Sequence, residues 1–490
     1  MGKHLRSPTL GHDRSKGNAV FLFRNRSKRT THARQRIVIL GGGFAGVYAA
    51  LRLEKTLARG PVIEIVLVSR ENFLLFTPML HEVVTGELAP TDIVNSLHKL
   101  LRRVDLFLGE VESIDLAGRS VTVSHGDGHH HHELPFDHLV LALGASTNFF
   151  SLPGVQERAL TMKSLGDALH LRNHIIKNLE EADFECCADR RQSLLTIVVA
   201  GAGFAGVETI GGLNDFIRES LKFYPHLKEE MLRFVLVGAG PAVLPELSPK
   251  LGAYAQKKLA RRGIEILLNT RVESASDQGV ELSNGTTIKT NTLIWTGGNA
   301  PHPLLTTLPC QKERGRPLVN EFLEVPEWPG VWAVGDCAAI HDPRTAKLYP
   351  PTAQHALRQG RVLARNLRAA IRGGAKKPFV YSTLGQLAAI GKRTGVANIL
   401  GLNFSGFIAW FLWRTIYLSK LPRLEKKVRV ALNWTLDLFF SKDLVHYSAA
   451  RACGVPHENG AASVAGTNQV STQQRSPNGE REKSHERTSL

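Results

Sequence analysis

A six-residue glycine loop occurs twice in this chain, and each copy joins an aliphatic run to a helix-forming segment. Residues 41–46 (Gly-Gly-Gly-Phe-Ala-Gly) follow the run 37–40, and residues 201–206 (Gly-Ala-Gly-Phe-Ala-Gly) follow the run 196–200. A strand, a glycine turn and a helix in this order are typical of a dinucleotide-binding βαβ unit, in which the glycines make the turn, admit the pyrophosphate and pack helix on strand. Because five of the six loop residues are identical, the repeat predicts two such units and two bound nucleotides.

Two further aliphatic runs, 63–68 and 234–237, complete the two units. Strand-like segments at 137–145 and 291–298 follow one after each repeat and end in small residues, which let a ligand approach the backbone closely. The sequence therefore predicts an α/β fold with two Rossmann-like dinucleotide-binding domains, the second inserted in the first. The residues expected at the nucleotides are Gly41, Gly43, Phe44, Ala45, Gly46, Ser69, Glu71 and Gly144 in the first unit, and Gly201, Gly203, Gly206 and Gly297 in the second.

An acidic residue is expected at the end of the second strand of each unit, where it binds a ribose 2′-hydroxyl. The first unit has Ser69 and Arg70 there, with Glu71 displaced along the chain. The second has residues 238–240 (Gly-Ala-Gly) and no carboxylate. Loss of that carboxylate removes a group that would repel a 2′-phosphate, but no arginine follows to attract one. The sequence therefore leaves the choice between NADH and NADPH open.

The charge of the chain is concentrated at its start. The net charge is +17, and residues 1–36 hold ten lysines and arginines against one aspartate. We expect residues 1–35 to be a disordered basic tail, with an organelle transit peptide as the alternative. The polar residues 451–490 are expected to be disordered as well. A hydrophobic fraction of 43% and a mean hydropathy of −0.10 are typical of a multidomain globular body and argue against a polytopic membrane protein.

Cysteine and histidine patterns predict little metal or dithiol chemistry. The five cysteines contain no C-x-x-C pair, which favours a reducing compartment and argues against a redox dithiol. The histidine run 129–132, with His125 and Asp127, lies in a glycine- and aspartate-containing loop. We expect this loop to be solvated and to hold no metal.

In this arrangement the chain resembles the two-dinucleotide-binding flavoproteins and, among them, the type II NADH dehydrogenases (NADH:quinone oxidoreductases). The resemblance covers about residues 36–450. It is carried by several pieces in the right order, which are residues 37–46, 72–80, 201–208, 330–337, 353–360 and 387–391, together with an aromatic C-terminal segment.

The resemblance implies FAD on the first unit and NADH on the second, with Gly335, Asp336 and Ala353 also at the FAD. It implies that Glu208 lies near the flavin and nicotinamide, where a carboxylate could order the nicotinamide or modulate proton flow. Gln354 resembles the glutamine of an Ala-Gln quinone-site motif. The alternatives are an acid favoured by the helix dipole at Glu208 and an ordinary helix-face glutamine at Gln354.

The C-terminal segment predicts a partner surface. Phe404, Phe407, Ile408, Phe411, Leu412 and Leu418 follow helical spacing. This segment is shorter than the about 20 residues that span a bilayer. A basic stretch and a second tryptophan-bearing apolar segment follow, so we expect residues 404–440 to bind a membrane surface. A dimerisation or core hairpin is the alternative, and we expect a homodimer.

The expected domains are an FAD-binding domain at 36–155 and 312–375, an NAD(P)H-binding domain at 156–311 and a C-terminal membrane-associating domain at 376–450. The predicted activity passes electrons from NADH through FAD to a membrane quinone. The expected location is peripheral, at the cytoplasmic face of a bacterial cell membrane, or at the mitochondrial inner membrane if the start is a transit peptide.

Three alternatives compete with this activity. A sulfide:quinone oxidoreductase would need a cysteine pair at the flavin, for which Cys310 and Cys337 are the candidates. A redox-sensing NADH-binding flavoprotein would turn over slowly with every quinone. Nucleic-acid binding rests on the basic tail alone, and we expect no nucleic-acid partner.

Overall fold

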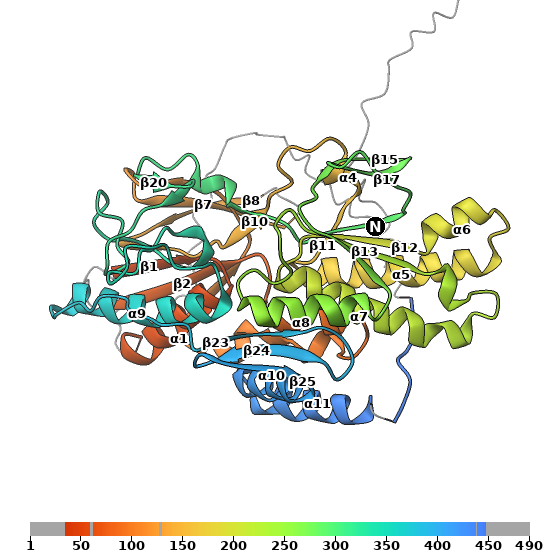
Figure 1. Ribbon diagram of the computed structural model, residues 1–490. Coiled ribbons are helices and arrows are strands. Elements are labelled where there is room, and N and C mark those ends of the chain that lie inside the picture. Colours follow the sequence, from red (N-terminus) through yellow and green to blue (C-terminus); the bar gives the residue numbers. More distant parts are fainter. Residues whose placement is uncertain (1–34, 59–61, 127–129, 438, 447–490) are drawn as a thin grey trace, which may run out of the picture. The chain divides into compact units, whose positions relative to one another are not determined.

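The computed structural model describes residues 35–58, 62–126, 130–437 and 439–446. Cys453 and the segment containing Asp127 and His129 lie outside these ranges, as do the predicted tails apart from Gln35, which begins β1. Two five-stranded parallel sheets organise the described residues (Figure 1). The first has the order β22-β9-β1-β2-β5, with bounds β1 (Gln35–Leu40), β2 (Ile63–Ser69), β5 (Asp105–Leu108), β9 (His138–Leu141) and β22 (Val331–Ala333).

The second parallel sheet repeats this design, in the order β11-β18-β12-β13-β14. Its strands are β11 (Leu160–Thr161), β12 (Thr196–Ala200), β13 (Arg233–Val237), β14 (Ile264–Leu267) and β18 (Thr292–Trp295). All five residues of β12 are buried, as expected for an inner parallel strand covered on both faces. The second sheet is inserted in the chain between β9 and β22 of the first. The predicted α/β fold with two Rossmann-like sheets is therefore confirmed.

Helices cover both sheets. In the first unit α1 (Phe44–Thr56) packs on α9 (Ala353–Arg372), and a Cβ at Gly360 would collide with the carbonyl oxygen of Ala45. The two helices therefore touch through their backbones. The second unit has α5 (Leu165–Phe184), α7 (Phe204–Ser220) and α8 (Pro249–Ala260), and the shorter helices are α2 (Leu80–Val84), α3 (Leu97–Leu100), α4 (Val155–Arg158) and α6 (Ala188–Leu194).

Small antiparallel elements complete the two units. β10 (Ala145–Thr147), which follows β9 of the first sheet, pairs antiparallel with β19 (Asn299–Pro301), which follows β18 of the second. The remaining strands are β3 (Phe73–Leu75) with β4 (Val94–Ser96), β6 (Glu110–Asp115) with β7 (Ser120–His125) and β8 (His130–Pro135), β15 (Val272–Ser276) with β16 (Gly279–Leu282) and β17 (Thr287–Ile288), and β20 (Lys312–Glu313) with β21 (Arg316–Pro317).

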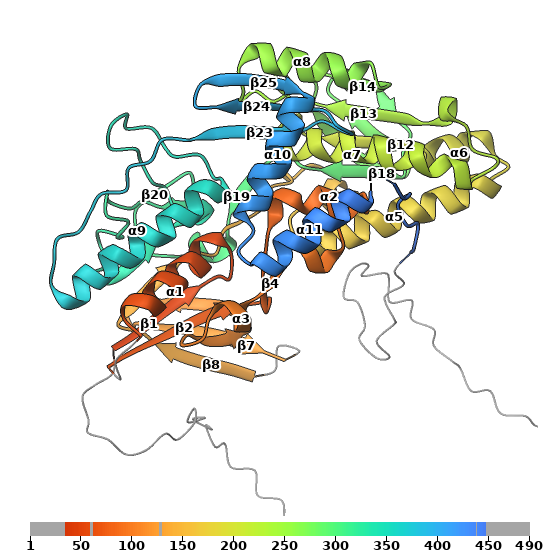
Figure 2. The ribbon, with the colours of Figure 1, turned by 90° about the horizontal axis from the view of Figure 1, so that it is seen from below.

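The C-terminal part is a three-stranded sheet followed by two helices, drawn in blue in Figure 2. Its elements are β23 (Gly385–Ala389), β24 (Gly395–Ile399), β25 (Leu402–Gly406), α10 (Phe407–Lys420) and α11 (Leu424–Leu436). The helix expected from Phe404 begins three residues later, because Phe404 lies in β25 and pairs with Ala397. Within the described ranges, every helix is too short or too polar to span a membrane.

Candidate active site

The two glycine loops have the same backbone geometry. Gly41 and Gly201 have φ of +115° and +121°, in the region that favours glycine. Gly43 and Gly203 are the N-caps of α1 and α7, both with φ of −81°. Gly46 and Gly206, the last residues of the two loops, are equally constrained, because a Cβ there would collide with the carbonyl oxygen of Gly41 or Gly201. The first and last glycine of each loop therefore accept no larger residue, which explains why glycine recurs at these positions in both copies.

Open space lies above the third residue of each loop, Gly43 and Gly203. A Cβ at Gly43 would meet nothing within 4 Å, and one at Gly203 would meet only Glu246 Oε1 at 3.6 Å. Gly144, three residues after the end of β9, is open in the same way. The first amides of a helix have no partner within it, so each loop presents N–H donors to an anion in that space. The residues present fit a pyrophosphate at both loops.

Asp336 lies beside the first loop, in the turn after β22. Gly335 comes within contact of the loop, since a Cβ there would lie 3.1 Å from Ala45 Cβ. Its amide donates to Gln359 Oε1 at 2.9 Å. Burial raises the pKa of Asp336, while the nearby cations Arg316 and Lys163 oppose this rise. A half-buried carboxyl beside the first glycine loop can accept hydrogen bonds from cofactor hydroxyl groups.

The end of β2 brings Ser69 rather than Glu71 to the first loop. A Cβ at Gly42 would collide with Ser69 Oγ, and the Ser69 hydroxyl donates to the Glu71 carbonyl oxygen at 2.7 Å. Ser69 is buried, whereas the side chain of Glu71 is exposed. The structure therefore places Ser69, and not the side chain of Glu71, against the first glycine loop.

Near the second loop, the structure shows a cationic residue, Arg271, that the sequence analysis did not identify. A Cβ at Gly238 would lie 2.8 Å from Ala202 Cβ, which leaves no room for an acid at the end of β13. A cavity of about 580 Å³ is lined by Ala239, Arg271 and Glu273. Arg271 lies after β14, the neighbouring strand, and so comes to the same edge of the sheet as the loop after β13.

Glu208 is buried in the second turn of α7, close to the glycine loop of the second unit. Its Oε1 accepts hydrogen bonds from the Ala389 amide at 3.1 Å and from Trp413 Nε1 at 3.0 Å. Burial raises the pKa of Glu208 to about 8. At neutral pH this carboxyl therefore holds a proton for much of the time, and it can release that proton when the local charge changes.

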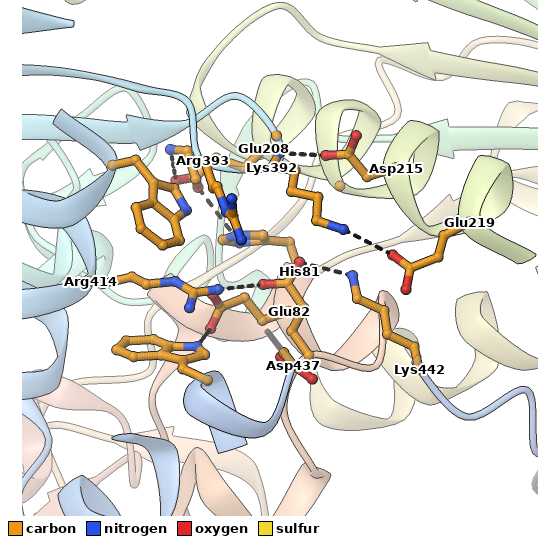
Figure 3. Close-up of a pocket in the computed structure, with 16 residues that line it drawn as sticks. His81, Glu82, Glu208, Asp215, Glu219, Lys392, Arg393, Arg414, Asp437 and Lys442 are labelled. Carbon is orange, nitrogen blue, oxygen red and sulfur yellow. Dashed lines mark hydrogen bonds and ion pairs between the residues drawn. The ribbon is translucent and has the colours of Figure 1, made fainter. Parts of the chain in front are cut away.

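His81 faces Glu208 from α2 (Figure 3). Its Nδ1 lies 3.9 Å from Glu208 Oε2. Burial lowers the pKa of His81 to about 4. Since the histidine is neutral and the acid is largely protonated at pH 7, this contact is not an ion pair under those conditions. His81 and Trp413 were not among the predicted site residues.

Gln354 lies in the first turn of α9, directly after Ala353. Its Nε2 donates to the Gly385 carbonyl oxygen at 3.2 Å, and its Oε1 accepts from the Tyr381 hydroxyl at 2.9 Å. An amide carries two N–H donors and two acceptor lone pairs. One donor and one lone pair therefore remain for a ligand, and the orientation of the amide is fixed by its protein contacts.

Of the two candidate cysteines, Cys337 is buried and Cys310 is partly exposed. Cys337 is fully buried, its thiol donates to the carbonyl oxygens of Leu141 and Val334 at 3.3 and 3.2 Å, and burial raises its pKa to about 11. Burial also raises the pKa of Cys310. Thiols that stay protonated are poor nucleophiles.

The histidine-rich hairpin forms stacked rings, with His125 and His132 centroids 4.8 Å apart. No metal-ligand cluster occurs among the described residues.

Comparison with known proteins identifies the family. The chain matches the pyridine nucleotide-disulphide oxidoreductase family over residues 35–360 and the NDH2 C-terminal domain over residues 384–443. A type II NADH:quinone oxidoreductase of Mycobacterium tuberculosis is 34% identical over 425 residues, which cover 84% of this chain and 89% of that protein. The chain belongs to the type II NADH:quinone oxidoreductases. The predicted FAD-dependent NADH:quinone oxidoreductase activity is thereby confirmed at the level of the family.

A further relative and two solved structures are also similar to the chain, and the two structures show the fold alone. An external alternative NADH-ubiquinone oxidoreductase, mitochondrial, of Yarrowia lipolytica is 30% identical and covers 87% of this chain and 84% of that protein. The NDH2 of Plasmodium falciparum, solved in complex with NADH, has a TM-score of 0.78 at 20% identity and covers 84% of this chain and 100% of that chain. A sulfide:quinone oxidoreductase of Aquifex aeolicus has a TM-score of 0.61 at 18% identity, which shows a shared fold alone.

Proposed function

We propose that Glu208 is the group of this type II NADH:quinone oxidoreductase that holds the proton required for quinone reduction. The supporting observation is its position. Glu208 belongs to the helix that begins at the second glycine loop, yet both of its hydrogen-bond donors, the Ala389 amide and Trp413 Nε1, come from the C-terminal sheet and helices. The carboxyl therefore joins the nucleotide side of the protein to the side where α10 and α11 lie.

We propose that the first glycine loop, with Gly144, Gly335 and Asp336, holds FAD. The loop supplies N–H donors and open space for the pyrophosphate, and Asp336 supplies an acceptor for cofactor hydroxyls. When bound, FAD supplies the two-electron chemistry that connects NADH to the quinone. The second loop, from Gly201 to Gly206, and Gly297 hold NADH by the same design.

Gln354 is proposed as the amide that meets the quinone or the edge of the flavin. Tyr381 and the Gly385 carbonyl fix its orientation. Because the remaining donor N–H is held in place, it can bond to a quinone oxygen with little loss of side-chain entropy. Ala353 is the first residue of α9, next to Gln354.

The C-terminal helices are proposed to bind a membrane surface. Along α11 an exposed apolar stripe recurs every four residues, with Leu424, Val428, Leu432 and Leu436 exposed by 75%, 51%, 58% and 51%. Phe407, Ile408 and Phe411 of α10 are also exposed. Lysines and arginines border the stripe, and such a pairing of apolar and basic groups suits an anionic lipid surface. A peripheral location at the membrane follows, as expected from the sequence.

A homodimer is proposed from a second exposed apolar patch. Leu400 and Leu402, in and beside the turn between β24 and β25, are exposed by 77% and 65%, and Leu384 lies against Leu400 through a 3.0 Å backbone hydrogen bond. Replacing Leu400 and Leu402 by glutamate is expected to give monomers in analytical ultracentrifugation. A parent protein that sediments as a monomer would reject the dimer, and an unchanged sedimentation coefficient of the variant would reject this patch as its contact.

The proposed roles can be tested by anaerobic mixing of the flavin-loaded protein with NADH and then with a short-chain quinone, while flavin absorbance is followed. Glu208→Gln is expected to leave bleaching by NADH intact and to slow reoxidation by the quinone at least tenfold. Gln354→Leu is expected to raise the KM for quinone more than it lowers kcat. Equal slowing of both half-reactions by Glu208→Gln would reject its role in the quinone step.

A further inference from the structure

A short segment leads into the first strand of the C-terminal sheet and contacts the Gln354 amide at both of its ends. The Tyr381 hydroxyl donates to Gln354 Oε1 at 2.9 Å, and the Gly385 carbonyl oxygen accepts from Gln354 Nε2 at 3.2 Å. Between these two contacts, residues 382–384 are exposed to solvent. The amide is therefore bracketed by the two ends of one short segment of chain.

The backbone of Tyr381 is held more firmly than the exposed residues that follow it. Its amide donates to Tyr349 Oη at 3.2 Å, and its carbonyl oxygen accepts from Arg344 Nη2 at 3.2 Å. Arg344 is itself fixed by an ion pair with Asp342 at 2.8 Å. Because all three partners precede α9 in the chain, the backbone of Tyr381 is fastened to the loop that leads into the helix of Gln354.

The ring of Tyr381 is fixed as well, by two residues of α9. The Arg358 guanidinium carbon lies 4.2 Å from the ring centroid, and the His355 ring meets the tyrosine edge-on at 5.1 Å between centroids. Arg358 Nη1 also donates to the Gln354 carbonyl oxygen at 2.7 Å. A planar guanidinium both stacks on an aromatic ring and is attracted to its face. The Tyr381 hydroxyl is therefore held at Gln354 Oε1.

The chemistry of these two partners decides which way the amide faces. A backbone carbonyl oxygen only accepts, so Gly385 requires the Nε2 end of the amide on its side. The hydroxyl of Tyr381 then meets the Oε1 end, where it acts as the donor. A hydrogen bond received at the oxygen of an amide polarises the group and strengthens the donation from its N–H. Tyr381 therefore restrains the amide and makes its remaining N–H a stronger donor.

A second tyrosine of this chain shows that stacking on α9 does not by itself create such a contact. The ring of Tyr48, on α1, also lies under an arginine of α9, with the guanidinium carbon of Arg361 at 4.9 Å from its centroid. Of these two tyrosines, it is Tyr381 whose hydroxyl bonds to Gln354. Tyr48 is therefore a matched control for the packing of a tyrosine against this helix.

We propose that Tyr381, with Arg358 stacked on its ring, is a positioning residue for the quinone, because it holds the Gln354 amide with its free N–H toward a quinone oxygen. The proposal rests on the role given to Gln354 above. A quinone carbonyl only accepts hydrogen bonds, and a donor that is already fixed binds it without the entropy loss of ordering a mobile side chain. Tyr381 therefore sets the affinity for the quinone and leaves the reaction with NADH unaffected.

Tyr381→Phe tests this role, since it keeps the ring against Arg358 and removes the hydroxyl. With the flavin-loaded protein, the KM for duroquinone is expected to rise about fivefold, which corresponds to about 1 kcal/mol. The kcat with duroquinone, the bleaching of the flavin by NADH and turnover with ferricyanide should stay as in the parent protein. Calorimetric titration with duroquinone in the absence of NADH should show the same rise in Kd. Tyr48→Phe is expected to change none of these values, and an unchanged KM and Kd in Tyr381→Phe would overturn the proposal.

Arg358→Lys provides a second variant at the other side of the ring. Lysine keeps the positive charge and most of the alkyl chain, but it lacks the planar group that stacks on Tyr381. The KM for duroquinone is expected to rise at least twofold, with turnover on ferricyanide unchanged. If Tyr381→Phe does not fold, an unchanged KM in Arg358→Lys overturns the proposal in its place.

A double-mutant cycle separates this proposal from the one on which it rests. Because Tyr381 acts through Gln354, Tyr381→Phe is expected to cause no further rise in KM when Gln354 is already replaced by leucine. An equal rise in both backgrounds would overturn the proposal, since Tyr381 would then act without Gln354. If Gln354→Leu raises the KM and Tyr381→Phe does not, the role of Gln354 stands and the positioning role of Tyr381 is rejected. If Gln354→Leu leaves the KM unchanged, the role of Gln354 is rejected first.

Discussion

The indole N–H of Trp413 donates to Glu208 Oε1 across 3.0 Å, although 205 residues separate the two in the chain. Trp413 is fully buried, and its ring packs edge-on against His81 at 5.5 Å and Tyr417 at 4.8 Å between centroids. This single bond connects α10, whose other face is exposed and apolar, to the buried acid of α7. A shift of α10 would therefore act directly on the proton affinity of Glu208.

We predict that Trp413→Phe raises the pKa of Glu208 above about 8. The indole bond favours the ionised form, and a hydrogen bond to a charged group contributes roughly 1.5–3 kcal/mol. Because one pKa unit corresponds to about 1.4 kcal/mol, the expected rise is roughly one to two units. The pH profile of quinone reduction, measured from pH 6 to 10, should shift upward by that amount.

Trp410→Phe is the control for this prediction. Trp410 also lies on α10, where its ring contacts Arg414 at 4.4 Å, but Glu208 accepts from Trp413. The Trp410 variant is expected to keep the pH profile of the parent protein. An identical shift in both variants would show that the profile reports the packing of α10 and not this hydrogen bond.

Glu208 should also make stability depend on pH. Its folded-state pKa of about 8 exceeds the ordinary value of 4.5, so between these values the folded protein binds more protons than the unfolded chain. Its contribution to stability is full below about pH 4.5 and is lost as the pH rises through about 8, by at most about 1.4 kcal/mol per pH unit. The folded-state pKa of His81 is instead lowered from 6.5 to about 4, so the contribution of His81 to stability is lost as the pH falls through this range.

The window from pH 6.5 to 8 therefore isolates Glu208 from His81. In that window, the melting temperature of the parent protein is expected to fall more steeply with pH than that of Glu208→Gln, which cannot ionise and retains the acceptor oxygen. Scanning calorimetry at a fixed heating rate measures both slopes. Parallel curves would contradict the raised pKa.

The nucleotide loops were predictable from sequence because their constraints are local. Gly41 and Gly201 need a backbone conformation that other residues avoid, and the glycines that follow are spaced along one short turn. The same reasoning located the inner strands of the two sheets, since aliphatic runs of this kind belong to buried parallel strands. The helix expected from Phe404 was placed too early, because an apolar residue near a helix start fits a strand as well as a helical face.

The surroundings of Glu208 and Arg271 were not predictable in the same way. The Ala389 amide lies 181 residues from Glu208, and no periodicity marks two positions so far apart as partners. Arg271 follows a strand that is adjacent to β13 only once the sheet has formed. Long-range contacts of this kind depend on strand order and helix packing, which local patterns leave undetermined.

We predict that the protein accepts NADPH as well as NADH, through Arg271. An acidic side chain does not fit at position 238, because its Cβ would collide with Ala202. Arg271 lines the cavity beside Ala239. A guanidinium bonded to a 2′-phosphate contributes of order 1–2 kcal/mol, roughly tenfold in affinity. Arg271→Ala is expected to raise the KM for NADPH about tenfold while leaving the KM for NADH nearly unchanged.

Glu273→Gln gives the complementary test at the same cavity. The Glu273 carboxylate would repel a 2′-phosphate and attract a ribose hydroxyl, so its removal should lower the KM for NADPH and raise that for NADH. Steady-state kinetics with both nucleotides measures the two ratios. Equal changes for NADH and NADPH in both variants would show that the cavity does not meet the 2′-position.

The apolar stripe of α11 yields a prediction for membrane binding. Burying an apolar side chain of this size contributes roughly 1.5–3 kcal/mol, and Leu424, Val428 and Leu432 are more than half exposed. Replacing all three by glutamate should release the protein from vesicles of anionic phospholipid in a co-sedimentation assay, while turnover with a soluble quinone continues. Phe184→Glu with Phe223→Glu is the control, because these side chains are 79% and 52% exposed but lie outside α10 and α11. If the control pair releases the protein as well, general surface charge explains the loss; if the triple variant stays bound, another surface holds the membrane.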